Sequence, residues 1–235
     1  MRANRAIAVR FRLVALALLA IGAISAAHAA ESSARSDYAA AARLTADSAR
    51  GRELFGVCAA CHGVDGNGQR DGSIPAIAGQ HRSVLLRQLI DFRHQRRWDI
   101  RMEHFAASKR FPDLADLVDL AAYASSLPVR PGRAQTGNGT ELRSGVSAYL
   151  TNCSRCHGTS GQGDSAKDVP RLAGQHYEYL VRQMHDTMEN RRPNMAPTHI
   201  DLLRRVLDRD VIDGIADYLS RLCADRACSG PPQNQ

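Results

Sequence analysis

The segments Cys58-Ala59-Ala60-Cys61-His62 and Cys153-Ser154-Arg155-Cys156-His157 share the pattern C-x-x-C-H. Two cysteines at this spacing reach the two vinyl groups of one porphyrin as thioethers, and the adjacent histidine meets the iron as the proximal ligand. The pattern therefore predicts two covalently attached haem c groups, bound through the four cysteines, with His62 and His157 on the irons. A C-x-x-C pair by itself is also typical of zinc sites and redox dithiols.

The two motifs lie 95 residues apart, and the same offset relates much of the surrounding sequence. The matched positions are Pro75 and Pro170, Ala78-Gly79-Gln80-His81 and Ala173-Gly174-Gln175-His176, Gln88 and Gln183, Asp91 and Asp186, Arg96-Arg97 and Arg191-Arg192, Tyr123 and Tyr218, and Leu127 and Leu222. A period of this length indicates a duplicated domain and not a solenoid unit. The duplication favours two haem sites over zinc or dithiol chemistry.

The first thirty residues have the features of a secretory signal peptide. Basic residues come first, an apolar run from Leu13 to Ile24 follows, and Ala27-His28-Ala29 fits the small-x-small cleavage rule. The basic residues are Arg2, Arg5, Arg10 and Arg12. We expect cleavage before Ala30 or Glu31 and a periplasmic mature protein. An uncleaved anchor is the alternative, which the short run disfavours because a spanning helix needs about 20 apolar residues.

The remaining charge and cysteines limit the function classes. Without the leader, which holds four arginines and no acidic residue, the formal net charge falls from +7 to +3. Basic residues are not interleaved with aromatic ones, so a nucleic-acid partner is not expected. Cys223 and Cys228 lie outside the haem motifs. An oxidising compartment favours a disulfide between them over two free thiols.

Helical periodicity without strand-like alternation predicts an all-α fold of two tandem domains, each a few short helices wrapped around a haem. We divide the chain into a signal peptide (1–30), a flexible arm (31–46), a first domain (47–127), a linker (128–140) and a second domain (141–228). Helices are expected at 81–93 and 112–127, and again at 141–153, 176–190 and 208–222. Aromatic residues make up 5% of the chain, so the haem must supply much of the buried apolar surface.

Methionine is the first candidate for the distal ligand of each iron. Met195 stands between Pro193 and Pro197, which we expect to hold an extended loop against the iron. Met184 and Met188, spaced i and i+4 in an expected helix, are more typical of core packing. The first domain offers Met102, whose offset from Met195 is 93.

Histidines provide an alternative distal pair. His104 and His199 keep the offset of 95, so bis-histidine ligation competes with Met102 and Met195. A surface location is the other interpretation of these two histidines. We favour the methionines, and the choice matters because a methionine ligand raises the reduction potential.

From Asp47 to Leu222 the sequence resembles the periplasmic two-domain dihaem cytochromes c of the cytochrome c-four type, which are built from class I cytochrome c domains. The shared features are C-x-x-C-H-G before a glycine-rich loop, Pro-x-x-Ala-Gly-Gln before a helix, an arginine-containing loop with methionine, and a terminal helix with Ala-x-Tyr or Ala-Asp-Tyr. The resemblance implies that Pro75 and Pro170 lend their carbonyls to the proximal histidines. Such contacts fix the imidazole ring and tune its basicity.

Two further groups of residues stand near the motifs. Gln80-His81 and Gln175-His176 precede expected helices, where capping and packing are favoured over a polar role at a haem edge. A basic cluster is interpreted either as a partner for haem propionates or an acidic protein, or as solvated surface. The cluster consists of Arg93, Arg96, Arg97 and Arg101.

Two linked haems without the signature of a substrate pocket predict a one-electron carrier and not an enzyme. We expect it to shuttle between a membrane oxidoreductase and a terminal oxidase or reductase of a respiratory chain, with peripheral membrane contact compatible with this role. One alternative is the cytochrome subunit of a periplasmic dehydrogenase such as a flavocytochrome c sulfide dehydrogenase. Another is a haem enzyme with one open iron site.

Overall fold

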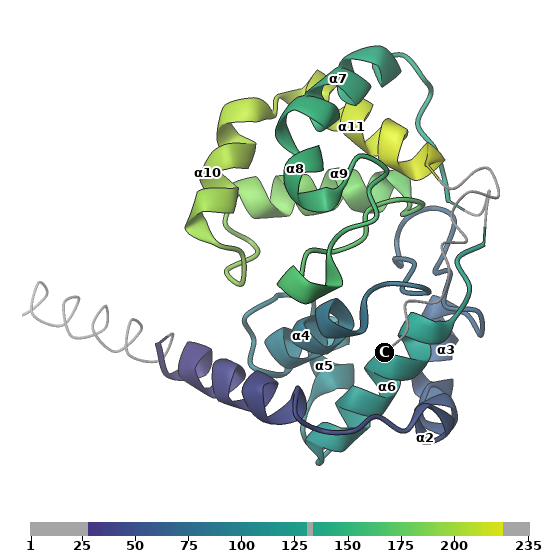
Figure 1. The fold of residues 1–235 in the computed structure, drawn as a ribbon, viewed down its shortest axis with the longest axis vertical. Coiled ribbons are helices and arrows are strands. Elements are labelled where there is room, and N and C mark those ends of the chain that lie inside the picture. The colour runs from purple at the N-terminus through teal and green to yellow at the C-terminus, as the bar shows by residue number, and fades with distance from the viewer. Residues whose placement is uncertain (1–27, 131–133, 223–235) are drawn as a thin grey trace, which may run out of the picture.

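The computed structural model describes residues 28–130 and 134–222, which form two stacked helical domains (Figure 1). Within these ranges there is no β-strand, and one isolated bridge joins Asp164 to Val169. The all-α expectation is confirmed. No helix in the described part of the chain is long and apolar enough to cross a membrane. The signal peptide up to residue 27, the linker residues 131–133 and the Cys223–Cys228 pair lie outside the described residues.

The first domain has five labelled helices. They are α2 (Ser48–Leu54), α3 (Gly56–His62), α4 (Arg82–Arg93), α5 (Ile100–Ala106) and α6 (Leu114–Ser126). Asp47 begins α2, because its carboxylate accepts hydrogen bonds from the backbone N–H of Ala49 and Arg50. Phe55 separates α2 from α3 and is 3% exposed, with its ring centre 5.2 Å from that of Tyr123 on α6. This edge-to-face contact ties the haem-motif helix to the terminal helix of the domain.

The second domain repeats the order. It contains α7 (Leu142–Asn152), α8 (Ser154–His157), the 3-10 helix η1 (Ser165–Lys167), α9 (Tyr177–Met188), α10 (Pro197–Val206) and α11 (Arg209–Arg221). Gly145 of α7 lies against Gly214 of α11 so closely that a Cβ atom at Gly145 would stand 2.0 Å from the Gly214 carbonyl carbon. Glycine is therefore required where these two helices cross.

The five expected helices are present, with ends that differ by at most two residues from the predicted ones. The sequence analysis missed α5 and α10, the short helices that carry Met102 and His199. Pro197, expected to hold an extended loop, is instead the first residue of α10. Proline suits this position because its fixed φ matches a helix and its missing N–H would have no partner there.

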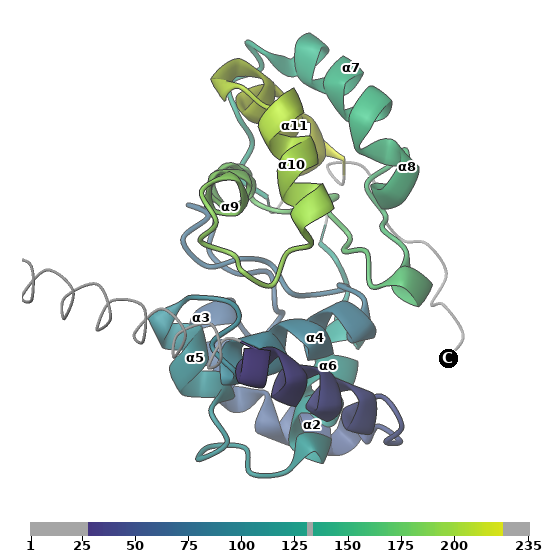
Figure 2. The same ribbon diagram turned by 90° about the vertical axis from the view of Figure 1, so that its left-hand side faces the viewer.

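The expected flexible arm at 31–46 is wrong. Residues 28–41 form a helix, drawn in purple in Figure 2, whose side chains at Ala34 and Ala41 are buried in the core of the first domain. Alanine has the highest helix propensity, and its small side chain lets the helix lie close to its neighbours. The Tyr38 hydroxyl also donates a 2.9 Å hydrogen bond to Asp168 of the second domain. This helix therefore contacts both domains.

Candidate functional site

The first C-x-x-C-H motif lies on α3. Cys58 and Cys61 are one turn apart as free thiols, and His62 is the last residue of the helix, 6% exposed. The His62 Nδ1 atom lies 2.9 Å from the carbonyl oxygen of Pro75. Because Nδ1 carries the proton that this carbonyl accepts, Nε2 is the nitrogen left for a metal. Burial lowers the pKa of His62, which keeps the imidazole in the neutral form that binds iron.

The second motif repeats this unit. Cys153 lies between α7 and α8, Cys156 and His157 lie on α8, and His157 Nδ1 is 3.1 Å from the carbonyl oxygen of Pro170. Burial lowers the pKa of His157 as well. The proline contacts that the resemblance implied are thus present in both domains. Each domain brings together two thiols and a neutral, oriented imidazole.

His199 is the distal candidate that the structure brings to the second motif. It lies in the first turn of α10, and its ring centre is 6.3 Å from that of His157, with an interplanar angle of 65°. Burial first, and then the nearby His157 and Arg192, lower the pKa of His199. Met195 is half-buried in the turn before α10, where its N–H donates to the Arg192 carbonyl. Among the contacts of the described residues, the ring contact of His199 is the one that joins a distal candidate to His157.

The first domain differs at the equivalent place. Met102 is half-buried in the first turn of α5, and its backbone N–H donates to the Asp99 carboxylate that caps the helix. After burial and the Pro75 carbonyl, the charge of Arg101 lowers the pKa of His62 and that of Asp99 raises it. His104 is exposed, and its ring contacts the neighbouring Phe105. Met102 is therefore the less exposed of the two distal candidates in this domain.

Two methionines and the basic cluster have structural contacts. Met184 and Met188 pack against the core of the second domain, as expected. The four clustered arginines all have partners within the chain. Arg93 donates to backbone carbonyls, Arg96 pairs with Asp91, Arg97 with Tyr179 and Gln183, and Arg101 with Asp99. Arg101 is exposed, as the solvated-surface interpretation expects, whereas the other three arginines are half-buried in contacts within the chain.

Arg192 is a candidate that the sequence analysis missed. Its Nε atom is buried and has no hydrogen-bond partner among the described residues. Burial, followed by the charge of Arg97, lowers the pKa of Arg192 to about 9. A buried guanidinium N–H with an unfilled bond fits a carboxylate such as a haem propionate, to which arginine binds strongly. Another nitrogen of the same guanidinium donates to Gln88 of the first domain at 3.3 Å, so Arg192 lies at the domain boundary with its Nε–H unfilled.

Gln80 and Gln175 cross the boundary between the domains. The Gln80 side chain accepts from the N–H of Arg171 at 2.9 Å and donates to the Arg171 carbonyl at 2.8 Å. In the reciprocal contact, Gln175 accepts from the N–H of Ala76 at 3.0 Å and donates to the Ala76 carbonyl at 2.8 Å. These four bonds follow the 95-residue repeat, so the domains dock with near two-fold symmetry.

The histidines that follow these glutamines extend the same interface. His81 Nε2 lies 2.8 Å from the Gln162 carbonyl, and His176 Nε2 lies 2.8 Å from the Asn67 carbonyl. Neither histidine caps its helix through its side chain. The expected capping role is wrong because these side chains hydrogen-bond backbone groups of the opposite domain. His176 is 1% exposed, so the contact lies deep in the interface.

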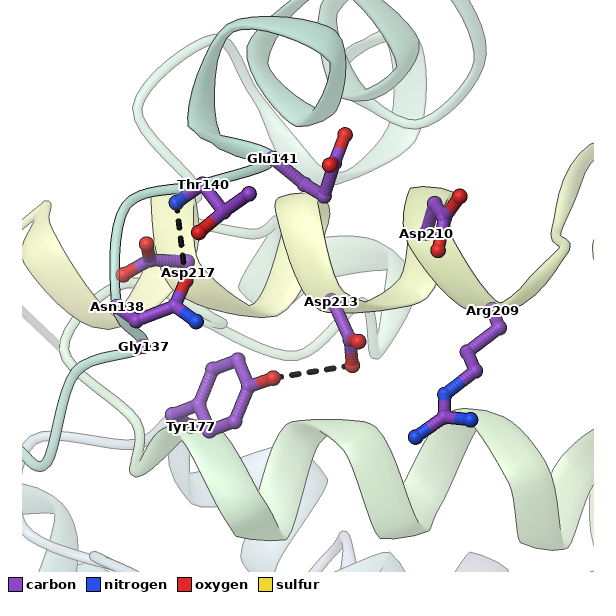
Figure 3. Close-up of a pocket in the computed structure, with 9 residues that line it drawn as sticks. All are labelled: Gly137, Asn138, Thr140, Glu141, Tyr177, Arg209, Asp210, Asp213 and Asp217. Atoms are coloured by element: carbon purple, nitrogen blue, oxygen red, sulfur yellow. Dashed lines mark hydrogen bonds between the residues drawn. The ribbon is translucent and has the colours of Figure 1, made fainter.

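A surface pocket of about 330 Å³ lies elsewhere, between the linker, α9 and α11 (Figure 3). Its lining is mainly acidic, and Tyr177 donates to Asp213 across it at 3.0 Å. None of the motif cysteines or histidines lines it. The pocket is therefore separate from the two haem sites.

Comparison with known proteins agrees with this geometry. The family model described as cytochrome c matches residues 48–128 and 142–222. Cytochrome c4 of Pseudomonas aeruginosa is 31% identical over 188 residues, covering 77% of this chain and 91% of the relative. The thiosulfate dehydrogenase electron acceptor of Stutzerimonas stutzeri is 29% identical, covering 70% and 78%.

Two solved structures have similar folds. Reduced recombinant cytochrome c4 from Pseudomonas stutzeri superposes with a TM-score of 0.64 at 29% identity, covering 75% of this chain and 98% of that one. Thiosulfate dehydrogenase from Marichromatium purpuratum superposes with a TM-score of 0.65 at 26% identity, covering 74% and 40%.

Proposed function

The chain belongs to the cytochrome c family, and from this premise we propose that it is a periplasmic dihaem carrier that passes single electrons between proteins of a respiratory chain. In each domain the bound haem c supplies an iron that takes up and releases one electron. The observation that carries the proposal is the repeated unit of two thiols, a histidine whose pKa is lowered by burial, and a proline carbonyl. Like the cytochrome c4 relatives, the chain is an electron-transfer protein and not an enzyme.

We assign the covalent attachment to Cys58 and Cys61 in the first domain and to Cys153 and Cys156 in the second. His62 and His157 are the proximal ligands. Their Nδ1–H groups are held by the carbonyls of Pro75 and Pro170, which fixes each ring and increases its basicity. Arg192 is the candidate partner for a propionate in the buried region near α10.

In the second domain we assign the distal position to His199 in place of Met195. The His199 imidazole is half-buried, burial lowers its pKa, and its ring centre lies 6.3 Å from that of His157, so these two histidines would hold the iron of the second domain. In the first domain the half-buried Met102 is the distal ligand, and His104 stays on the surface.

These ligand sets make the two domains unequal. A methionine ligand raises the reduction potential, so the first domain is the better electron acceptor. With these ligands, bound haems would favour electron transfer from the second domain to the first. The difference in reduction potential between the domains would therefore set the direction of electron transfer within the protein.

The deciding experiment is an optical redox titration of the purified protein with a haem count. We expect two haems, all low-spin, and one methionine-to-ferric-iron band at long wavelength for every two haems. Two such bands would assign Met195 instead of His199. A high-spin fraction that binds carbon monoxide would point to an open iron site and hence to the enzyme alternative.

A second candidate function is favoured by the thiosulfate dehydrogenase electron acceptor relative. In that role the chain takes electrons from a periplasmic sulfur-compound dehydrogenase, the same class of partner as the flavocytochrome alternative. Mixing the oxidised protein with thiosulfate dehydrogenase and thiosulfate separates the two candidates. Rapid reduction supports the acceptor role, whereas reduction by a membrane quinol oxidoreductase alone supports the respiratory role.

A further inference from the structure

The carbonyl groups that hold the proximal histidines belong to peptides that also contact the opposite domain. The Pro75 carbonyl and the Ala76 N–H are two ends of one peptide group. Its oxygen accepts from His62 Nδ1 at 2.9 Å, and its N–H donates to Gln175 of the second domain at 3.0 Å. One peptide therefore joins the proximal ligand of the first domain to a side chain of the second.

The second domain has the equivalent arrangement, related to the first by the near two-fold symmetry. The Pro170 carbonyl accepts from His157 Nδ1 at 3.1 Å, and the N–H of the same peptide, at Arg171, donates to Gln80 at 2.9 Å. All the members of the two sets are related by the 95-residue repeat. Each proximal histidine is therefore linked, through one peptide group, to a glutamine of the opposite domain.

The orientation of each glutamine amide is fixed by its other bonds. Gln175 Oε1 also accepts from the N–H of His176 at 3.0 Å, while Nε2 donates to the Ala76 carbonyl at 2.8 Å. Gln80 makes the equivalent bond to His81 N–H at 3.0 Å and donates to the Arg171 carbonyl. Turning either amide over would set an NH₂ group against two N–H donors, so the oxygen must face the peptide.

This geometry couples the glutamine to the imidazole electronically. The C–N bond of a peptide is conjugated, and hydrogen bonds in a chain polarise one another. An N–H that donates to glutamine leaves the carbonyl oxygen a stronger acceptor for the imidazole N–H. A stronger bond at Nδ1 makes the imidazole a more basic ligand, which stabilises ferric iron over ferrous iron.

We propose that Gln175 is a positioning residue for His62 and that Gln80 is one for His157, so that each domain lowers the reduction potential of the haem in the other. The proposal rests on the two-haem carrier function. Its consequence is that domain docking and redox tuning depend on the same four hydrogen bonds. A change in docking would alter both potentials.

The test is a redox titration of the full chain followed by proton NMR, in which haem methyl signals are assigned through contacts with residues of their own domain. Gln175→Leu keeps the size of the side chain but removes the acceptor. We expect the potential of the first-domain haem to rise, with a smaller change at the second. Gln80→Leu is expected to give the reverse pattern.

Two control variants test whether a shift in reduction potential comes only from weakened docking of the domains. Ser83→Ala removes another interdomain bond, from the Ser83 hydroxyl to the Ser165 carbonyl at 3.0 Å, and should move neither potential. With its carboxyl group protonated, Gln175→Glu keeps an acceptor for the Ala76 N–H and a donor to the Ala76 carbonyl, so at low pH the first-domain potential should stay at or below that of the wild type.

Equal shifts of both haems in Gln175→Leu, a larger shift in the mutated domain, or an upward shift in Gln175→Glu at low pH would each overturn the proposal. An absence of any shift would overturn it too. The same titration counts the haems in the wild type, so failure of the carrier function would be seen separately as fewer than two reversible haems.

Discussion

The ring of His199 lies 6.3 Å from the ring of His157, at an interplanar angle of 65°. Under the proposed ligand assignment, these two imidazoles would hold the iron of the second-domain haem. Replacing His199 by methionine should therefore convert the second domain to histidine–methionine ligation. We expect His199→Met to add a second long-wavelength ferric band and to raise the potential of the second-domain haem.

Met195→Leu is the matched control for this substitution. If His199 is the ligand, Met195→Leu leaves the ferric spectrum and both potentials unchanged. Loss of a methionine band or appearance of high-spin haem in Met195→Leu would instead assign the distal position to Met195. The optical spectrum of each variant decides between the two.

The prediction of Met195 as the distal ligand rested on the prolines on either side of it. The prolines at 193 and 197 suggested an extended loop, but Pro197 begins α10 and thereby brings His199 into its first turn. The motif cysteines, the proximal histidines and the main helices depend on local spacing, so they were predictable. The contacts of Gln80 and Gln175 depend on how two domains dock, which no local pattern encodes. Arg192 is one of a repeated pair of arginines, and its burial becomes visible only in the folded chain.

The close crossing of α7 and α11 predicts that adding a single methyl group at Gly145 destabilises the protein. A Cβ at Gly145 would stand 2.0 Å from a backbone carbon of Gly214, and backbone cannot move aside cheaply. We expect Gly145→Ala to lower the free energy of unfolding by about 1–3 kcal/mol. Denaturant unfolding of the ferric protein, followed by circular dichroism, measures the change.

Gly56→Ala is the control, because a Cβ at Gly56 meets no atom within 4 Å. Alanine there favours the helix, so the variant should be neutral or up to about 1 kcal/mol more stable. Equal destabilisation by both substitutions would contradict the close-crossing explanation.

Asp168 predicts an acid-dependent contribution to stability. Burial raises its pKa, but the hydrogen bonds from Arg87 and Tyr38 and the charge of Arg87 together lower it more, so the carboxyl ionises below its usual range. A lowered folded-state pKa means that the stabilisation is complete above the unfolded pKa of about 4 and is lost as the pH falls through the folded value. We expect Asp168→Asn to cost about 1 kcal/mol at neutral pH, allowing for solvent exposure of the cluster, and little at low pH.

Asparagine suits the left-handed backbone at this position, where φ is +55°, so the substitution removes the charge without new strain. Unfolding midpoints of wild type and Asp168→Asn, measured from neutral to strongly acidic pH, should converge in acid. Asp164→Asn is the control, since its ion pair with Lys167 is exposed and contributes little. A stability difference for Asp168→Asn that does not change with pH would rule out the charge as its source.

Substitution of Arg192 tests whether a propionate of the bound haem pairs with the Arg192 guanidinium. Without a carboxylate partner, replacing this buried charge by an apolar side chain would be neutral or stabilising. With a propionate bound, Arg192→Met leaves a buried carboxylate unpaired, which costs about 3–5 kcal/mol. We expect the holoprotein to lose stability accordingly in thermal unfolding followed by haem absorbance. Arg191→Met, at the exposed neighbouring position, should change stability by no more than about 0.5 kcal/mol. An Arg192→Met holoprotein as stable as the wild type would show that no acid group of the haem reaches this arginine.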